Sequence, residues 1–287
     1  MPEIIGYPSS YTLVKSVDGG KTFDPPVELD DQNCVCCQTA SAVSPDGEIY
    51  FAWRDLQYEH DLIPVNAENP YNYGFSNGSL FDSFKNKKYE SIRDIVTMHT
   101  LDNGTGKKFS PITKVSQDKW YIAGCPDAGP GIAFDSLGRL HAAWFTGSDT
   151  APNGIGYYYA YSDDGGKTFS EPLALLADKE FIPPTEVSLA IDNKDNTWIT
   201  FADQRNPDVV RYSKINTDHP GKVQLSIIDK NHQMVFSGPI FDGQINEQLD
   251  LAMSSNDDNA FIAYRDGNDT KIAVISSHLG PNEVSTT

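Results

Sequence analysis

Hydrophobic and polar residues alternate along the chain in short runs that are typical of strands. The runs YTLVK (11–15), DIVTMHT (94–100) and IGYYYAY (155–161) are rich in aromatic and β-branched residues, and a polar turn that contains glycine follows each of them. Runs of this length and composition, bounded by turn residues, favour antiparallel hairpins. The pattern therefore predicts an all-β protein.

The polar turns after these runs repeat one motif. SVDGGKTFDPP (16–26) and SDDGGKTFSEP (162–172) share the pattern Ser-x-Asp-x-Gly-x-Thr-Phe followed by proline, and TLDNGTGKKFSP (100–111) is a looser copy with two inserted residues. The Ser or Thr and Asp side chains can accept bonds from backbone amides within such a turn, glycine adopts positive φ, and the aromatic ring packs beneath. Each motif is expected to join two strands of one hairpin.

A second repeat interleaves with the first. TASAVSPDGEIYFAWRD (39–55), PGIAFDSLGRLHAAWFT (130–146), VSLAIDNKDNTWITFAD (187–203) and DLAMSSNDDNAFIAYRD (250–266) align without gaps, and their starts lie 91, 57 and 63 positions apart. Each copy has the pattern of a buried strand, a polar turn and a second strand that ends in an aromatic residue. Together the two repeats predict four-stranded antiparallel units, A-B followed by C-D, which is the organisation of propeller blades.

The motif Ser-x-Asp-x-Gly-x-Thr-Phe is that of the Asp box, and over nearly its whole length the chain resembles the sialidase-like, Asp-box (BNR repeat) β-propeller superfamily. We expect residues 1–287 to form a single propeller domain. The chain contains a leading C-D pair, three full blades and a final A-B-C group. We therefore favour five blades with the two termini sharing one; the alternative is six blades with a truncated N-terminus. The resemblance implies that the Asp boxes are structural turns away from the active site.

Propeller topology separates two faces. The D-to-A and B-to-C loops lie on one face, here called the loop face, and the A-to-B turns and Asp boxes lie on the other, here called the turn face. Cys34, Cys36 and Cys37 of the stretch NCVCCQTA lie in a D-to-A loop, and Cys125 in AGCPDAG holds the position of Cys34 one blade further on. All four cysteines of the chain are therefore predicted on the loop face of adjacent blades.

Three interpretations of the cysteines stay open. A disulfide from Cys34 or Cys37 to Cys125 would join neighbouring blades, whereas a vicinal Cys36–Cys37 bond would be strained. Alternatively, thiolates from the Cys-x-Cys-Cys loop and from Cys125 would form a soft ligand set that favours copper(I) or zinc. Buried thiols without a partner are the third interpretation.

The loop face also carries arginines at the ends of the B strands. Arg54, Arg205 and Arg265 could surround one pocket, and the resemblance implies an arginine triad that binds a substrate carboxylate, an aspartate acid/base and a tyrosine nucleophile activated by glutamate. The chain lacks the Phe-Arg-Ile-Pro motif that carries the first sialidase arginine, and no tyrosine can be singled out. Arg-Asp pairs that tie blades together are the alternative interpretation. The substrate-binding set predicted with these arginines also includes the carboxylates Asp55, Asp127, Asp203, Glu247 and Asp266.

A long insertion, residues 55–92, falls in the B-to-C loop of the second blade and is rich in Tyr, Phe and Asn. Loops of this length are often lids or binding surfaces. The insertion would bring His60 near the cysteines, and His60 is the first candidate for a further metal ligand or an acid/base group, against a solvated loop histidine. The predicted metal set is therefore Cys34, Cys36, Cys37, Cys125 and His60, with copper or zinc as the ion.

Charge restricts the partners. The chain has 40 acidic and 22 basic residues, a net charge of −18 and a pI near 4.5. Such a field repels nucleic acid, and no apolar run approaches the roughly 20 residues of a membrane span. A small molecule, a glycan or a metal ion at the loop face is the expected partner. The stretch 1–14 does not have the basic start and apolar core of a signal peptide, and we expect an extracellular, periplasmic or cell-envelope protein.

Three functions follow as hypotheses. The first is an exported propeller whose cysteine-lined face binds copper or zinc or is joined by disulfides. The second is a glycoside hydrolase of the exo-sialidase type, or a glycan-binding propeller, that uses the arginines of the same face. The third is a non-catalytic propeller that binds other proteins.

Overall fold

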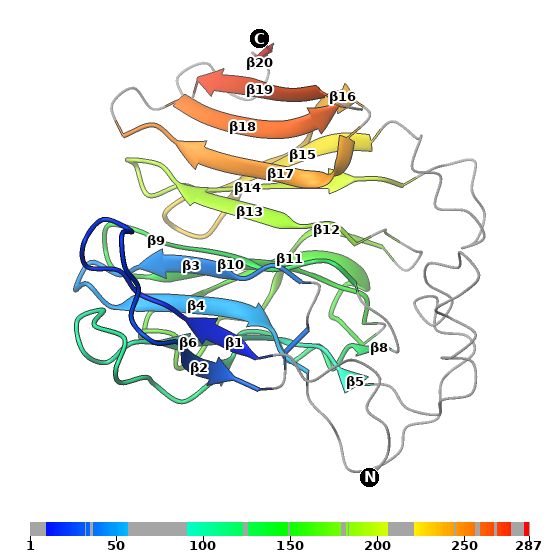
Figure 1. Ribbon diagram of the computed structural model, residues 1–287. Helices are drawn as coiled ribbons and strands as arrows, with labels where there is room; N and C mark the ends of the chain where they lie inside the picture. The colour runs from blue at the N-terminus through cyan, green and yellow to red at the C-terminus, as the bar shows by residue number, and fades with distance from the viewer. Residues whose placement is uncertain are drawn as a thin grey trace.

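A computed structural model gives the fold of the chain (Figure 1). All the regular structure in its described part is β-strand, and no helix there could span a membrane. The structure describes residues 10–31, 33–34, 37–56, 91–122, 126–148, 150–178, 182, 184–205, 221–243, 245–255, 259–266, 269–276 and 284–286.

Four sheets of four antiparallel strands dominate the molecule, and each follows the chain in order from A to D. The first contains β3 (Ala40–Val43), β4 (Ile49–Arg54), β6 (Ile95–His99) and β7 (Thr113–Lys114). The second contains β9 (Gly131–Phe134), β10 (Leu140–Thr146), β11 (Ile155–Ser162) and β12 (Leu173–Asp178). The third contains β13 (Val187–Ile191), β14 (Thr197–Asp203), β15 (Gly221–Ile228) and β16 (Met234–Gly243). The fourth contains β17 (Ile245–Met253), β18 (Asn259–Asp266), β19 (Asp269–Ser276) and β20 (Val284–Thr286).

The four A-B hairpins predicted from the sequence are confirmed as β3–β4, β9–β10, β13–β14 and β17–β18. The predicted sharing of one blade by the two termini is wrong. The last sheet completes itself because β20 pairs with β19, while β1 (Tyr11–Leu13) and β2 (Val27–Asp30) form a separate two-stranded sheet. The described strands therefore make four complete blades and one two-stranded blade. A further pair, β5 (Ser91–Ile92) and β8 (Tyr121–Ile122), lies at the loop face.

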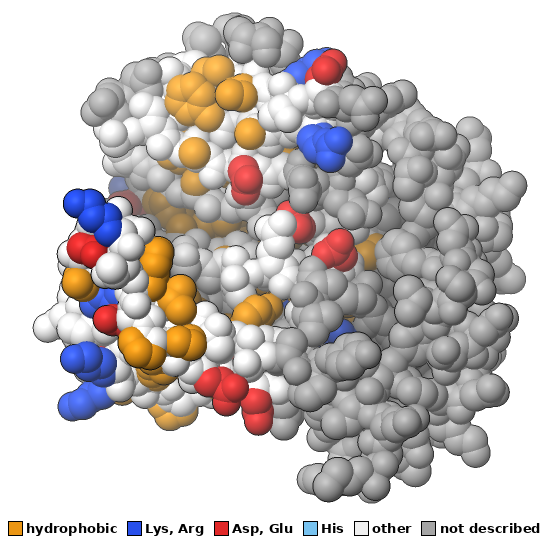
Figure 2. Space-filling view, viewed as in Figure 1, with side chains coloured by type: hydrophobic (Ala, Val, Ile, Leu, Met, Phe, Trp, Pro, Cys, Tyr) orange, Lys and Arg blue, Asp and Glu red, His pale blue; other side chains and the backbone are white. Residues whose placement is uncertain are grey.

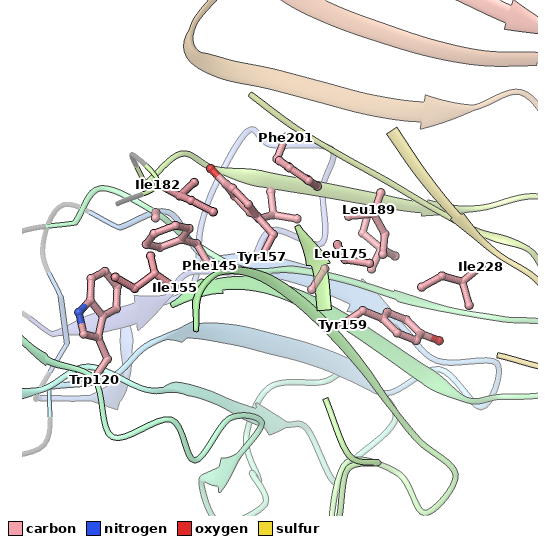
Figure 3. Close-up of a cluster of buried hydrophobic side chains, with 14 residues drawn as sticks. Trp120, Phe145, Ile155, Tyr157, Tyr159, Leu175, Ile182, Leu189, Phe201 and Ile228 are labelled. Atoms are coloured by element: carbon pink, nitrogen blue, oxygen red, sulfur yellow. The ribbon is translucent and has the colours of Figure 1, made fainter. Parts of the chain in front are cut away.

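Successive blades pack face to face through apolar side chains. Figure 3 shows the cluster between the second and third four-stranded sheets, where Tyr157 of β11 stacks on Phe201 of β14 with ring centroids 3.9 Å apart. Aromatic pairs of this kind contribute about 0.5–1.5 kcal/mol beyond the burial of their area. Trp120 lies at the loop-face end of this cluster, so the core reaches the loops that connect the blades.

The two-stranded sheet is attached through polar as well as apolar contacts. Trp53 of β4 donates from Nε1 to Asp30 Oδ2 of β2 at 2.7 Å, and its ring meets Tyr11 of β1 edge-on with centroids 5.6 Å apart. Tyr11 and Leu29 also pack against the cluster of Trp53, Val96 and Met98. The first blade therefore has a fixed place beside its neighbour, although it has only two strands.

The Asp boxes have the local geometry that their sequence predicts. In the second box Asp164 Oδ1 accepts from the backbone amides of Lys167 and Thr168 at 3.0 and 2.9 Å, and Oδ2 accepts from the Thr168 hydroxyl at 2.7 Å. Asp18 makes the same three bonds in the first box. Asp102 of the looser copy accepts from three backbone amides. The boxes lie between strands C and D, on the turn face.

The described surface mixes charges. Figure 2 shows Lys and Arg side chains interspersed with Asp and Glu on the face in view, so the net charge of −18 is not gathered into one acidic patch among the described residues of this face. The same view shows hydrophobic side chains over the last sheet, where Phe261 of β18 is 37% exposed and Ile272 of β19 is 46% exposed.

Candidate functional site

The loop face is assembled from the ends of three strands and from the segments that follow them. Strand β4 ends at Arg54, strand β6 begins after Asp94, and the connection from β7 to β9 runs through residues 115–130. The backbone amide of Asp55 donates to the Asp94 carbonyl, and that of Arg93 donates to the Trp120 carbonyl. The first bond joins the two ends of the B-to-C connection, and the second holds its end against the D-to-A connection that leads to the next blade.

Arg54 is a buried link between segments. Its side chain is 1% exposed, and its guanidinium donates to the carbonyls of Arg93 at 2.6 Å, of Phe145 at 2.7 Å and twice of Ala128 at 3.0 and 3.1 Å. The guanidinium carbon also lies 4.9 Å from the centroid of the Trp120 ring. A planar fork with five donors suits three carbonyls from separate segments. Because backbone carbonyls occupy these donors, Arg54 joins neighbouring blades and has no guanidinium face left for a ligand carboxylate.

The other two arginines have different surroundings. Arg205 pairs with Asp203 of its own strand end through two bonds of 2.7 and 2.8 Å, and this pairing raises the arginine pKa. Asp178 of β12 lies 3.8 Å from Arg205 Nη1, so the pair also faces the preceding blade. Arg265 is exposed on β18. The three predicted arginines thus comprise one buried link, one ion pair and one exposed side chain.

Two buried carboxyl groups of the loop face were missed by the sequence reasoning. Asp94 is 1% exposed: its Oδ1 accepts from the Trp120 amide at 3.3 Å, whereas its buried Oδ2 has no hydrogen-bond partner among the described residues. Burial, and then the neighbouring Asp118, raise the pKa of Asp94 from 3.8 to about 6. Burial also raises the pKa of Asp118, although its Oδ2 accepts from Trp144 Nε1 at 2.8 Å. Asp94 directly precedes strand C and Asp118 lies in a D-to-A loop. Propeller topology could therefore have placed both residues on the loop face from the sequence.

Asp127 differs from both because its side chain is exposed. It has φ +49, a left-handed conformation that costs energy for a residue other than glycine and is often found at functional sites. Partial desolvation raises the pKa of its carboxyl group. Asp127 is therefore a solvent-accessible acid whose proton is held more tightly than in water.

Two of the predicted cysteines meet at the loop face. The Cys37 thiol donates to Cys34 Sγ at 3.2 Å, and Arg93 Nη1 donates to the same sulfur at 2.9 Å. The hydrogen bond from Cys37 lowers the pKa of Cys34 to about 5, with support from the charges of Arg93 and Arg54. Burial raises the pKa of Cys37. The arrangement makes Cys34 the thiolate and Cys37 the proton donor.

Several predicted site residues cannot be placed beside these. Cys36, Cys125 and His60 lie outside the described residues, as do the side chains of Glu247 in β17 and Asp266 in β18. Asp55, at the end of β4, is partly buried, and its carboxylate accepts from the Leu56 amide at 2.9 Å. Within the described part of the chain, no group of three His, Cys, Asp or Glu side chains is arranged to hold a metal ion. The copper or zinc site therefore stays a prediction.

Comparison with known proteins shows the fold. No protein-family model matches the chain, and no curated protein matches its sequence. Among solved structures, the α-L-arabinanase of Penicillium chrysogenum in complex with arabinobiose has a TM-score of 0.59 at 11% identity, over 96% of this chain and 72% of that one. The intramolecular trans-sialidase of Ruminococcus gnavus, in complex with oseltamivir carboxylate, has a TM-score of 0.52 at 10% identity, over 96% and 76%.

A third structure, the Hadza microbial sialidase Hz136, has a TM-score of 0.53 at 13% identity; the match covers 88% of this chain but 46% of the sialidase. All three similarities are too distant in sequence to carry residue roles across. They show that the chain has the sialidase-like β-propeller fold expected from its Asp boxes, a fold that these glycosidases share.

Proposed function

We propose that the protein is a glycoside hydrolase whose reaction takes place on the loop face, with Asp127 as the general acid. One observation carries the proposal: the loop face gathers carboxyl groups whose pKa values are raised, at Asp94, Asp118 and Asp127. Raised carboxyl pKa values are the requirement for proton donation to a glycosidic oxygen near neutral pH.

The roles divide by exposure. Asp127 is the exposed member, so it is the one that can reach a bound glycan and protonate the leaving-group oxygen. Asp94 and Asp118 are buried, so neither is available to protonate a bound glycan. Arg265 is exposed, so it offers its guanidinium group to an acidic sugar, whereas the guanidinium of Arg205 is paired with Asp203.

The similar structures named as sialidases and as an arabinanase guide the choice of substrates. We propose a glycan with an acidic or furanose terminal sugar, and a location outside the cytoplasm, where such polymers are met. The first assay is a panel of 4-methylumbelliferyl glycosides, which includes the α-sialoside and the α-L-arabinofuranoside, together with arabino-oligosaccharides.

The decisive variant is Asp127→Asn, which keeps the size of the side chain but removes the acidic carboxyl proton. General-acid catalysis contributes about 10²–10⁴-fold, so we expect kcat to fall by about that factor while the melting temperature stays unchanged. Asp24→Asn, at an exposed turn-face position, is the matched control and should keep full activity. The proposal fails if the protein hydrolyses no glycoside of the panel, or if Asp127→Asn is as active as the parent.

A further inference from the structure

The Cys34–Cys37 turn is fixed on several sides. The Cys37 amide donates to the Cys34 carbonyl at 3.2 Å, which joins the backbones of the two residues. The Cys34 amide donates to the Arg54 carbonyl at 3.0 Å, and the Tyr11 hydroxyl donates to the Cys37 carbonyl at 3.0 Å. The backbone around both cysteines is therefore tied to β1 and to the end of β4, so the two sulfur atoms are held in contact.

The sulfur atoms are close enough to react with each other. They lie 3.2 Å apart, and a disulfide of about 2.05 Å needs a further approach of only about 1 Å. Rotation of the two thiol side chains can supply that approach. The contact supplies the geometry for a bond between Cys34 and Cys37, a pairing that the sequence analysis did not consider.

Arg93 fixes the charge of the pair. Its Nη1 donates to Cys34 Sγ at 2.9 Å, while its backbone is held by the Trp120 carbonyl and by the guanidinium of Arg54. A positive group at this distance favours the thiolate, which is the form that attacks oxidants. The same charge repels a metal cation from this sulfur. The described contacts therefore favour thiol oxidation over metal binding.

Burial restricts the oxidant. Cys34 is fully buried and Cys37 is 5% exposed, so a protein disulfide cannot dock on either sulfur. Cys34 is closed even to a molecule of the size of water, so a small oxidant reaches it only through local opening of the structure around the slightly exposed Cys37. We propose that Cys34 and Cys37 form a redox-active dithiol that reduces small hydroperoxides, with Cys34 as the attacking cysteine and Cys37 as the resolving cysteine.

The reaction balances in two steps. The Cys34 thiolate attacks the terminal peroxide oxygen, an S–O bond forms, the O–O bond breaks, and the leaving alkoxide or hydroxide takes a proton from solvent. Cys37 then gives up its proton and attacks the Cys34 sulfur, so that an S–S bond forms, the S–O bond breaks and water leaves. Two thiols and one hydroperoxide yield one disulfide, one water and one alcohol, or a second water when the oxidant is hydrogen peroxide.

The test uses the full chain, reduced, desalted without oxygen and treated with one equivalent of hydrogen peroxide. We expect a thiol count in denaturant to fall from four to two, and mass spectrometry to show a loss of 2 Da on peptides that contain Cys34 and Cys37. Cys37→Ser should stop at a sulfenic acid on Cys34 that dimedone traps. Cys36→Ser is the matched control in the same loop and should be oxidised like the parent.

Arg93→Gln tests whether the positive charge of Arg93, and not only the short distance between the two sulfur atoms, promotes the oxidation. This variant keeps a donor but loses the charge, and we expect its oxidation rate to fall about tenfold or more while the disulfide still forms. Circular dichroism checks that each variant is folded. Three results would overturn the proposal: a disulfide that maps to Cys36 or Cys125, thiols that one equivalent of peroxide leaves intact, or one equivalent of copper or zinc that co-purifies with the protein and protects the thiols. None of them bears on the glycosidase assay.

Discussion

The aspartates of the two faces have opposite properties. On the turn face hydrogen bonds from the turns themselves lower the carboxyl pKa values, to about 2 for Asp102 and for Asp164, and also lower those of Asp18 and Asp229. On the loop face burial raises the pKa values of Asp94, Asp118 and Asp127. The same residue type therefore has a lowered pKa and a full set of hydrogen bonds at one end of the blades, and a raised pKa at the other.

The difference lies in what surrounds each carboxylate. A turn-face aspartate sits in water and accepts several amide hydrogen bonds, which stabilises its charged form and fixes the backbone of the turn. At the loop face loss of contact with water outweighs the hydrogen bonds that each aspartate accepts, so its carboxyl pKa rises. Turn chemistry thus serves the scaffold, and the loop face keeps groups that can exchange protons near neutral pH.

Arg54→Lys should have the largest effect on stability. Lysine keeps the charge but cannot bond three carbonyls from separate segments, so it leaves buried acceptors unsatisfied. We expect the free energy of unfolding to fall by about 3–5 kcal/mol, measured by urea denaturation. Arg139→Lys on the turn face is the control, because its ion pair with Asp163 is partly exposed and should contribute less than about 1 kcal/mol. Equal losses in the two variants would contradict the role of Arg54 as a link.

Asp94→Asn should change how stability depends on pH. The folded-state pKa of Asp94 lies near 6 and its ordinary value is 3.8, so the folded chain holds this proton between about pH 4 and 6 while the unfolded chain releases it. The contribution of Asp94 is complete below pH 4 and is lost as pH rises to about 6, which amounts to about 2–3 kcal/mol.

Asparagine removes that dependence. We expect Asp94→Asn to be more stable than the parent by about 1–2 kcal/mol at pH 7, because the unpartnered amide nitrogen offsets part of the gain. The advantage should vanish at about pH 4, where Asp94 is protonated in the folded chain and roughly half protonated in the unfolded chain. Thermal melts at pH 4, 5, 6 and 7 measure it, and parallel stability curves for the two proteins would refute the raised pKa.

The fold was predictable because its signals are local. The Ser-x-Asp-x-Gly-x-Thr-Phe turns form within a few residues, and the four hairpins follow from strand patterns and turn residues next to them in the sequence. The end of the chain was predicted less well. A final strand of three residues, β20, completes the last sheet, and its short sequence Val-Ser-Thr carries no pattern that distinguishes it from a loop.

For the candidate site, the sequence predicted the face of the propeller but not the surroundings of each residue. Topology placed Arg54, the cysteines and Asp127 at one end of the blades, but residue type did not reveal that backbone carbonyls occupy Arg54. Asp94 and Asp118 were missed because burial, which no motif encodes, distinguishes them from other loop aspartates. Environments of this kind depend on contacts between segments that are distant in sequence, such as Trp144 with Asp118.

The smallest predicted effect is a difference in stability between variants of two nearly identical Asp boxes. Asp18 and Asp164 make the same hydrogen bonds, but the first box is exposed, whereas the Gly165 carbonyl of the second accepts from the Tyr50 hydroxyl of the neighbouring blade at 3.2 Å. Asp164→Ala should therefore cost roughly 1–2 kcal/mol at pH 7, and Asp18→Ala should cost less.

The pH dependence checks the cause. Because the folded pKa of Asp164 lies near 2, its contribution is present above about pH 4 and is lost as pH falls towards 2, so the melting temperatures of the parent and of Asp164→Ala should converge there. Asp164→Ala with Tyr50→Phe completes a double-mutant cycle. Coupling between the two changes would show that the second box acts across blades, and strict additivity would show that both boxes act only within their own turns.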